Sequence, residues 1–168
     1  DNGCNSVHAA DVDGDGDIDV LSTSSFSFDS KVAWYENDGN EGFNEHVLSN
    51  EMLEFAKDVY AVDMDADGDM DILTGFGQRL SVFDNDGSEG FTEYVIPTEG
   101  SSNFESVHAV DVDGDGDMDV LSAAYFDINV AWYEQDGSPE PDLTSITQDN
   151  IQAAVDLWYS DPASAEET

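Results

Sequence analysis

Basic residues are almost absent from this sequence. Its 168 residues include 40 aspartates and glutamates but only 3 lysines and arginines, which gives a formal net charge of −37. Nucleic-acid binding requires clustered lysine and arginine, so that class of function is excluded. An anionic membrane surface would repel the chain for the same reason. Because such a charge destabilises a compact fold, the composition indicates bound metal ions, a saline habitat or both.

Cysteine and long apolar runs are also scarce. Cys4 is the only cysteine, so an internal disulfide is impossible, and its thiol is either inert or bonded to another chain or to a missing part of this one. No run approaches the ~20 apolar residues of a membrane span, and no signal peptide is visible. The chain begins at Asp1, as a mature or excised fragment would. We therefore expect no membrane insertion by this segment.

The sequence does contain an internal repeat. Residues 6–22 (SVHAADVDGDGDIDVLS) and 106–122 (SVHAVDVDGDGDMDVLS) are nearly identical, and residues 58–74 (DVYAVDMDADGDMDILT) are a diverged copy. Each copy is followed by an apolar, aromatic segment and a turn that ends in Asp-Gly. The repeat length of roughly 50 residues lies in the range of propellers and solenoids.

The segments between turns are short, alternate between apolar and polar residues, and are rich in β-branched and aromatic side chains. We predict an all-β fold in which each repeat forms four short antiparallel strands, the size of one β-propeller blade. The repeats span about 5–49, 57–97 and 105–137 within residues 1–137, and a proline-containing linker at 138–145 replaces the fourth strand of the third. The prediction is two full blades and one partial blade.

The last residues differ from the repeats. Thr147 or Asp149 can cap a short helix whose apolar face includes Trp158 and which ends before Pro162. A helix this short is unstable alone in water, so it should pack against other structure. We predict that residues 146–168 form a helical tail at the start of a following domain.

Three nine-residue runs of alternating aspartates carry the strongest chemical signal: 11–19 (DVDGDGDID), 63–71 (DMDADGDMD) and 111–119 (DVDGDGDMD). A tight turn brings the carboxylates at positions 1, 3 and 5 around one point, and glycine at position 6 permits the bend. Position 7 would offer its carbonyl, and the aspartate at position 9 would close the shell. Charged oxygen ligands in a flexible loop favour calcium over magnesium, so we predict three Ca²⁺ sites.

Two other interpretations of these runs are weaker. An EF-hand needs a bidentate glutamate at position 12 between two helices. Position 12 is Ser22, Thr74 or Ser122, and the flanking segments are strand-like. A purely solvated turn would leave five aspartates within nine residues to repel one another, with no lysine or arginine nearby. Three copies in the same register favour metal loops.

The aspartate runs, the aromatic segment and the ENDG–F turn together resemble the FG-GAP/VCBS repeat, a family that includes the blades of integrin-type β-propellers. The resemblance covers about Asn5 to Gly137 and implies one calcium ion in the loop between the first two strands of each blade. Propellers of this family have about seven blades, so three repeats cannot close such a ring alone. The implied ligands, with position 7 acting through its backbone, are Asp11, Asp13, Asp15, Asp17, Asp19, Asp63, Asp65, Asp67, Asp69, Asp71, Asp111, Asp113, Asp115, Asp117 and Asp119.

Several aromatic residues have both a structural and a functional interpretation. His8 and His108 match Tyr60 of the middle repeat, and this replacement argues against a metal or catalytic role. Trp34 and Trp132 could stack on sugar rings, although packing between blades is the simpler interpretation. No nucleophile–base pair or other catalytic constellation is apparent, so we predict no enzymatic activity.

These features predict a non-enzymatic calcium-binding module of a secreted or cell-surface protein, with a structural or adhesive role. Millimolar calcium outside cells would saturate even weak sites. An incomplete ring leaves open sheet faces, so we expect other protein domains or copies of the chain as partners, in a larger assembly or filament. Residues 146–168 also resemble the segment that precedes leucine-rich BspA-like surface-protein repeats.

Two alternatives remain open. The first is an accessory carbohydrate-binding domain of a secreted polysaccharide-acting enzyme, with Trp34 and Trp132 exposed as glycan platforms. The second is a calcium-dependent receptor-type propeller that binds a protein ligand.

Overall fold

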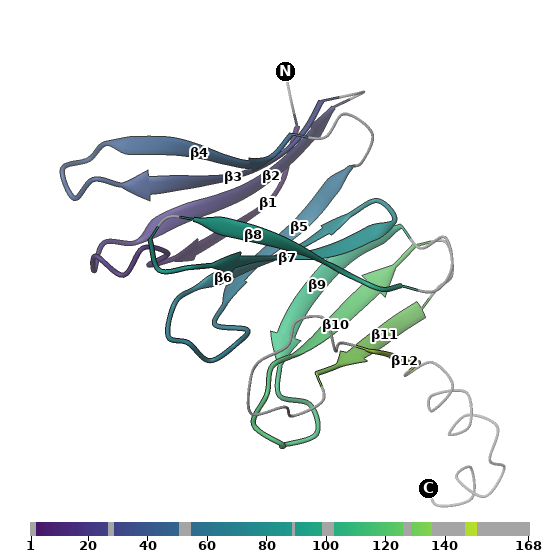
Figure 1. Ribbon diagram of the computed structural model, residues 1–168. Helices are drawn as coiled ribbons and strands as arrows, with labels where there is room; N and C mark the ends of the chain where they lie inside the picture. The colour runs from purple at the N-terminus through teal and green to yellow at the C-terminus, as the bar shows by residue number, and fades with distance from the viewer. Residues whose placement is uncertain are drawn as a thin grey trace, which may run out of the picture.

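Three antiparallel β-sheets follow one another along the chain in the computed structural model of the protein (Figure 1). The structure describes residues 3–26, 29–50, 55–88, 90–98, 103–125, 129–135 and 147–150. These residues form only strands and turns, which confirms the predicted all-β class, and they contain no helix capable of crossing a membrane. Each sheet is called a blade below.

Each blade consists of neighbouring antiparallel strands, and the order of strands within the sheet follows the chain. Blade 1 contains β1 (Gly3–Ala10), β2 (Asp19–Phe26), β3 (Asp29–Asn37) and β4 (Phe43–Ser49). Blade 2 contains β5 (Ala56–Val62), β6 (Asp71–Phe76), β7 (Arg79–Asn85) and β8 (Phe91–Ile96). Blade 3 contains β9 (Phe104–Val110), β10 (Asp119–Ala124), β11 (Asn129–Glu134) and β12 (Thr147–Asn150).

The third repeat itself supplies only three of these strands, as predicted for a partial blade. The short strand β12 comes from further along the chain and pairs with β11. An open strand edge presents unpaired backbone groups, which a later segment can satisfy. The helical tail was predicted over 146–168, but Thr147–Asn150 form this strand, so Thr147 and Asp149 lie in a strand and do not cap a helix. The rest of the predicted tail and the linker at 138–145 lie outside the described residues.

Alternation along the strands gives every blade two apolar faces. In blade 1, Ala9 pairs with Val20, which pairs with Tyr35, so these residues form one row on one face. The next row pairs Leu21 with Trp34 and lies on the opposite face. Blade 2 lies between the other two blades, so both of its faces are covered, whereas blades 1 and 3 each pack one face against blade 2.

The hydrophobic core is consequently divided into two layers, one between each pair of neighbouring blades. The first layer packs blade 1 against blade 2 and contains Val12, Leu21, Val32, Trp34, Ala56, Val59, Ala61, Ile72, Phe76 and Phe83. The second packs blade 2 against blade 3 and contains Met64, Leu73, Leu80, Val82, Ile96, Phe104, Val107, Ala109, Val120, Ala131 and Tyr133. Only 1% of Trp34 is exposed, which confirms the interpretation that it packs between blades and contradicts the alternative of an exposed sugar platform at this residue.

The first strands of the three blades, β1, β5 and β9, lie side by side (Figure 1). The rings of His8, Tyr60 and His108 form a row across them, with centroid separations of 4.7 Å and 4.6 Å. The matching positions therefore pack against one another, as expected for strand residues rather than metal ligands. Cys4, on β1, has an exposed thiol.

Asp58 connects all three blades through these inner strands. Its Oδ1 accepts hydrogen bonds from Ser6 Oγ of blade 1 at 2.6 Å and from the Val59 amide at 3.0 Å. Its Oδ2 accepts from Ser106 Oγ of blade 3 at 2.8 Å and from the Val107 amide at 3.0 Å. Burial alone would raise the pKa of this carboxyl, but the hydrogen bonds outweigh burial and hold its pKa below the ordinary value.

Candidate metal centres

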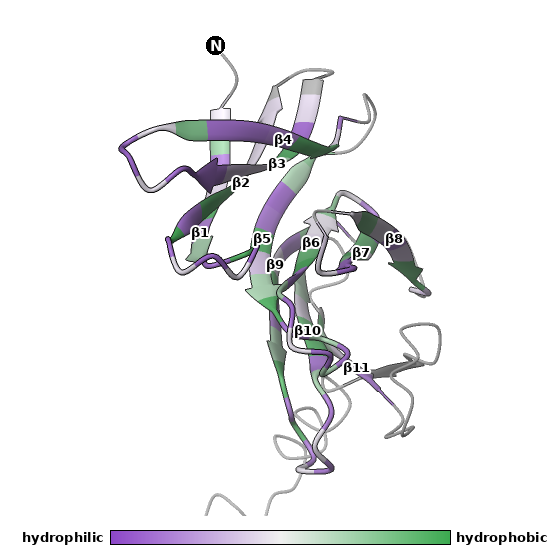
Figure 2. Ribbon diagram, turned by 60° about the vertical axis from the view of Figure 1, so that its left-hand side comes forward, coloured by the Kyte–Doolittle hydropathy of each residue, from purple (hydrophilic) through white to green (hydrophobic). Residues whose placement is uncertain are grey.

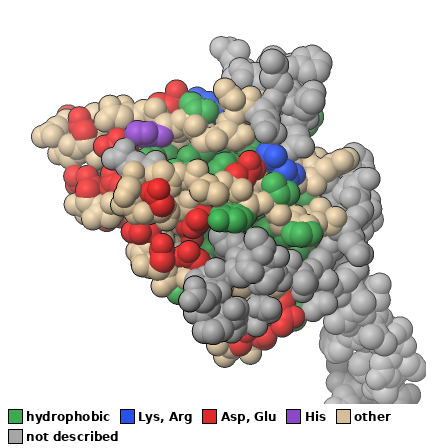
Figure 3. Space-filling model, in the orientation of Figure 1, with side chains coloured by type: hydrophobic (Ala, Val, Ile, Leu, Met, Phe, Trp, Pro, Cys, Tyr) green, Lys and Arg blue, Asp and Glu red, His purple; other side chains and the backbone are tan. Residues whose placement is uncertain are grey.

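The three aspartate runs form the loops between the first and second strands of the blades. They lie at the same end of the inner strands β1, β5 and β9 (Figure 1). These loops are coloured mainly as hydrophilic in Figure 2, and acidic side chains gather on the side of the molecule that carries them in Figure 3. The fold therefore concentrates negative charge at one rim.

Three carboxylates converge in each loop. One oxygen from each member of a trio lies within 4.8 Å of the other two, which is close enough for a single cation to contact all three. The trios in the first and third loops use positions 1, 3 and 5, whereas the middle loop uses positions 1, 3 and 9. They are Asp11, Asp13 and Asp15; Asp63, Asp65 and Asp71; and Asp111, Asp113 and Asp115.

The loop backbone is held in the same way in all three copies. In the first loop, the Gly16 amide donates to Asp11 Oδ2 at 3.1 Å, and the Asp15 amide donates to Asp13 Oδ1 at 3.1 Å. Equivalent bonds occur in the other two loops. The glycine at position 6 has φ of 97°, a left-handed conformation that glycine adopts without steric cost. These hydrogen bonds from backbone amides to aspartate carboxylates therefore stabilise the loop conformation in which the carboxylates converge.

The ninth aspartate joins each metal loop to the sheet. In the middle loop, buried Asp71 accepts hydrogen bonds from the amides of Met64 at 2.7 Å and Asn85 at 2.9 Å. Asp19 and Asp119 have matching partners in their own blades. Burial raises the pKa of Asp71 to about 7, although its two hydrogen bonds oppose the shift. A cation beside Asp71 would favour its charged form.

The sequence interpretation missed the residues that brace the ninth aspartate from the third strand. They occupy one register position, as Asn37, Asn85 and Gln135, and each donates its backbone amide to the aspartate of its own loop. The signal was present, because these residues open the turn that ends in Asp-Gly in every repeat. From the sequence alone, that turn indicates only a hairpin.

The seventh-position aspartates lie against the same turns. A Cβ atom on Gly39 would overlap the Asp17 carboxylate, and one on Gly87 would overlap the Asp69 carboxylate. Both glycines also have positive φ, of 67° and 68°. The glycine of the turn is therefore required both by its own conformation and by the approach of the metal loop.

The donor set fits a hard divalent cation. Asp11 Oδ1 and Asp63 Oδ1 are buried and have no hydrogen-bond partner among the described residues, an arrangement that is costly for a carboxylate. Burial and neighbouring aspartates also raise the pKa values of Asp13 and Asp65. A cation among these oxygens would satisfy the unpartnered atoms and offset the repulsion. The all-carboxylate donors and the flexible loop are those that calcium prefers.

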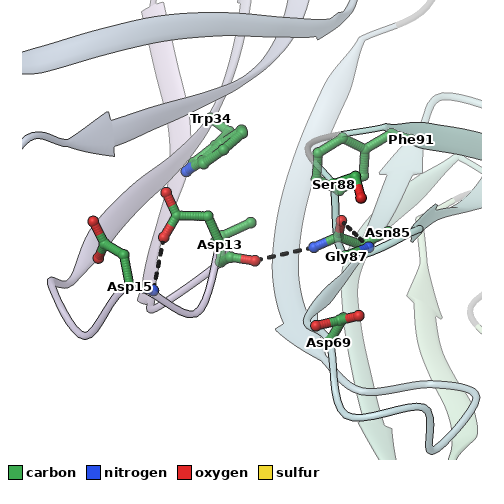
Figure 4. Close-up of a pocket in the computed structure, with 9 residues that line it drawn as sticks. Asp13, Asp15, Trp34, Asp69, Asn85, Gly87, Ser88 and Phe91 are labelled. Atoms are coloured by element: carbon green, nitrogen blue, oxygen red, sulfur yellow. Dashed lines mark hydrogen bonds between the residues drawn. The ribbon is translucent and has the colours of Figure 1, made fainter.

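A pocket next to the first loop lies at the boundary between blades 1 and 2 (Figure 4). Asp13, Asp15 and Trp34 line it from blade 1, and the indole nitrogen of Trp34 lies on the side facing Asp13. Asp69 and Asn85 line it from blade 2, and Asn85 Nδ2 donates to the carbonyl of Val12 at 3.0 Å. The geometry of the metal loop is thus coupled to contact between the blades.

The middle loop contains one strained residue that the other two loops avoid. Ala66 at position 4 has φ of 59°, whereas the matching Gly14 and Gly114 have φ of 73° and 84°. A Cβ atom on Gly14 would meet nothing within 4 Å, so the strain at this position comes from the backbone alone. We predict that Ala66→Gly raises the free energy of unfolding by about 1 kcal/mol, because a left-handed alanine costs about that much.

Thermal melting in calcium would measure this change as an increase of about 2–4 °C. The reciprocal variant, Gly14→Ala, should lower the melting temperature by a similar amount. Equal melting temperatures for wild type and both variants would show that the left-handed conformation at position 4 does not destabilise the loop.

The sequence matches the FG-GAP-like repeat over residues 11–74 and again over residues 63–122. Each match begins at one aspartate loop and ends just beyond the next, so together they contain all three loops. Comparison with curated proteins gives no match.

Proposed function

The chain belongs to the FG-GAP-like repeat family, and from this premise we propose that it is a non-enzymatic, calcium-stabilised structural module of an extracellular or cell-surface protein. The observation that carries the proposal is the convergence of three carboxylates in each loop. In two of the loops, one buried carboxylate oxygen has no hydrogen-bond partner within the part of the chain that the structure describes. Three ions would be held by residues that also bind the backbone of the sheet.

The residues around each loop support a stabilising role for the ion. Bound calcium would supply positive charge at the centre of a loop. Residues of the chain position that loop. Asp19 accepts a hydrogen bond from the Val12 amide, and the Val12 side chain packs into the core. The Val12 carbonyl accepts a hydrogen bond from Asn85 of the next blade. Ordering the loop thus orders the contact between blades, which couples metal affinity to folding.

The proposed location follows from the calcium requirement. Extracellular modules have dissociation constants of about 10⁻⁴–10⁻³ M, and calcium outside cells is of that order. An adhesive or assembly role agrees with the exposure of apolar side chains such as Val7 on blade 1 and Val130 on blade 3. The carbohydrate-binding alternative is weakened because Trp34 is in the core.

Calorimetric titration with calcium tests the proposal directly. We expect three ions per chain and a change in tryptophan fluorescence, since Trp34 lies beside the first loop. Asp13→Asn should remove or weaken one of the three sites by at least about tenfold, because it replaces a charged ligand with a neutral one. Glu105→Gln removes the same charge outside the loops and should leave all three sites unchanged.

A titration that shows no saturable calcium binding would overturn the proposed function. Equal loss of calcium binding in Asp13→Asn and Glu105→Gln would also overturn it, since that result would mean that calcium associates with the acidic surface in general and not with the loops.

A further inference from the structure

We propose that Asn85 couples the first two metal loops, so that calcium bound in either loop strengthens the binding of calcium in the other. This inference rests on the proposed function and deepens it, because it concerns how two of the calcium sites depend on each other. The third loop should depend on the second much less.

Asn85, the last residue of β7, makes hydrogen bonds with both loops. Its backbone amide donates to Oδ1 of Asp71, the ninth aspartate of the middle loop, at 2.9 Å. Its side-chain Nδ2 donates to the carbonyl of Met70 in the middle loop at 3.2 Å and to the carbonyl of Val12 in the first loop at 3.0 Å. Only 3% of Asn85 is exposed, so little water competes for these bonds. One buried residue therefore contacts a segment of each metal loop.

The other end of the amide fixes the orientation of the Asn85 side chain. The backbone amide of Gly87 donates to Asn85 Oδ1 at 3.2 Å, so the oxygen is directed at the turn and Nδ2 at the loop carbonyls. Asn85 and Gly87 lie on the blade 2 side of the pocket, opposite Asp13 and Asp15 of the first loop (Figure 4). The side chain thus reaches across the boundary between the two blades in a defined orientation.

Val12 is the residue through which Asn85 acts on the first loop. It lies between Asp11 and Asp13, two members of the carboxylate trio. The Val12 amide donates to Asp19 at 2.9 Å, and the Val12 side chain is 2% exposed in the core layer between blades 1 and 2. Because the residues on both sides of Val12 carry ligands, fixing Val12 restricts the loop to the conformation in which the ligands converge. A loop that is ordered before binding loses less entropy when it binds an ion.

The middle loop acts on Asn85 through Asp71. Asp71 belongs to the middle carboxylate trio, so its carboxylate is held in place when calcium is bound there. The same carboxylate accepts the hydrogen bond from the Asn85 amide. Occupancy of the middle loop therefore fixes Asn85, and Asn85 fixes Val12 of the first loop. Thermodynamic linkage requires the same strengthening in the reverse direction.

The residue of blade 3 that matches Asn85 does not make the contact with the preceding loop. Gln135 donates its backbone amide to Asp119 at 3.0 Å, as Asn85 does to the ninth aspartate of its own loop. The carbonyl that matches that of Val12 belongs to Met64, and among the described residues Gln135 does not donate to it. Gln135 Oε1 is also buried without a hydrogen-bond partner in that part of the chain. The second and third loops therefore lack the connection that joins the first and second.

Charge acts between neighbouring loops in the opposite direction. Calcium bound in one loop lowers the negative potential that attracts calcium to the next loop, and salt at about 0.15 M screens this effect beyond about 8 Å. Each of the three loops contains five aspartates, so the effect of charge is similar for the first and second loops and for the second and third. A difference in coupling between these two pairs of loops therefore isolates the contribution of Asn85.

Calcium titration of the full chain followed by NMR would measure the occupancy of each loop separately. The glycine at position 6 donates its amide to the first aspartate of its own loop at 3.1–3.2 Å, so its resonance should shift when that loop binds calcium. These reporters are Gly16, Gly68 and Gly116.

Two ligand substitutions compare the pairs of loops. Asp65→Asn weakens the middle site, and the calcium affinity of the first loop should then fall by about fivefold or more. Asp113→Asn removes the same charge from the third loop, and the calcium affinity of the middle loop should change much less. Asp13→Asn should weaken the middle loop by the same factor by which Asp65→Asn weakens the first, as reciprocity requires.

Substitution of Asn85 should remove the difference between the pairs. Asn85→Gln gives blade 2 the residue that blade 3 carries at this position, and Asn85→Ala removes the side-chain amide altogether. In both variants, the effect of Asp65→Asn on the first loop should fall to that of Asp113→Asn on the middle loop. Asn37→Gln is the matched control, because Asn37 Nδ2 donates to the carbonyl of Ile18 in its own loop at 3.1 Å, and the coupling should persist in this variant.

Equal dependence within the two pairs of loops in the wild-type background would overturn the proposal. Retention of the larger dependence in either variant of Asn85 would also overturn it, since the connection would then lie elsewhere. If all three glycine resonances saturate with calcium but independently of one another, the coupling is absent and the proposed function stands. If none of them shows saturable binding, the proposed function fails as well.

Discussion

Removal of calcium should lower the melting temperature of this protein by about 10 °C. The reason is the charge in the three loops, where buried carboxylate oxygens such as Asp11 Oδ1 have no hydrogen-bond partner among the described residues. Without an ion, these groups are neither solvated nor neutralised. The loops would then favour the unfolded chain, in which the aspartates separate and return to water.

The expected size follows from linkage between binding and folding. At free calcium ten times the dissociation constant, each site contributes about 1.4 kcal/mol to the free energy of unfolding, so three sites contribute about 4 kcal/mol. In a domain of this size, each kcal/mol shifts the melting temperature by about 2–4 °C. The effect should exceed that of any single ligand substitution, because it acts on all three loops.

Differential scanning calorimetry in calcium and in EDTA would measure this difference at matched ionic strength. Magnesium should not replace calcium, since it gives up its bound water reluctantly. If sodium chloride raised the melting temperature as much as calcium did, screening of the negative charge alone would explain the stability. The proposal that calcium bound in the loops stabilises the fold would then be wrong.

The metal loops could be predicted from the sequence because their geometry is local. Asp11, Asp13 and Asp15 lie within five residues, and the glycine at position 6 fixes the turn whatever surrounds it. The difference in the middle loop could not be predicted. There Asp71, rather than Asp67, joins the trio, and the position of Asp71 depends on Asn85 from another strand.

The four-stranded blades were predictable from alternation and turn residues, whereas the contacts between blades were not. Asp58 aligns with Ser6 and Ser106 and was interpreted only as part of a diverged copy. Its role depends on the meeting of three strands separated by about fifty residues, which no local pattern encodes. Strand β12 illustrates the same limit, since its pairing depends on an open edge formed far earlier in the chain.

Replacement of Asp58 by alanine should lower the free energy of unfolding by about 3 kcal/mol, although Asp58 lies outside the metal loops. Its carboxylate accepts four hydrogen bonds, including those from Ser6 in blade 1 and from Ser106 and Val107 in blade 3. Alanine would leave these donors without their acceptor between the inner strands. Both contacts between blades would therefore weaken at once.

The loss of stability in Asp58→Ala should depend on pH, and the direction of the pKa shift of Asp58 determines the direction of that dependence. The pKa of Asp58 is lower in the folded protein than its ordinary value of 3.8, so the folded state favours the charged carboxylate. The contribution of Asp58 to the free energy of unfolding is therefore fully present above pH 3.8, and it is lost as the pH falls through the pKa of Asp58 in the folded protein. The stability difference between wild type and Asp58→Ala should be constant near neutral pH and should shrink in acid.

Denaturant unfolding at a series of pH values, in EDTA throughout so that metal release does not contribute, would measure this difference. Asp84→Ala is the matched control, because burial and the nearby Asp67 and Asp86 raise the pKa of Asp84 and its removal relieves repulsion. Asp84→Ala should cause little loss of stability, and Ser6→Ala should cause only a fraction of the loss seen for Asp58→Ala. If Asp58→Ala were no more destabilising than Ser6→Ala, the carboxylate would not connect the three blades.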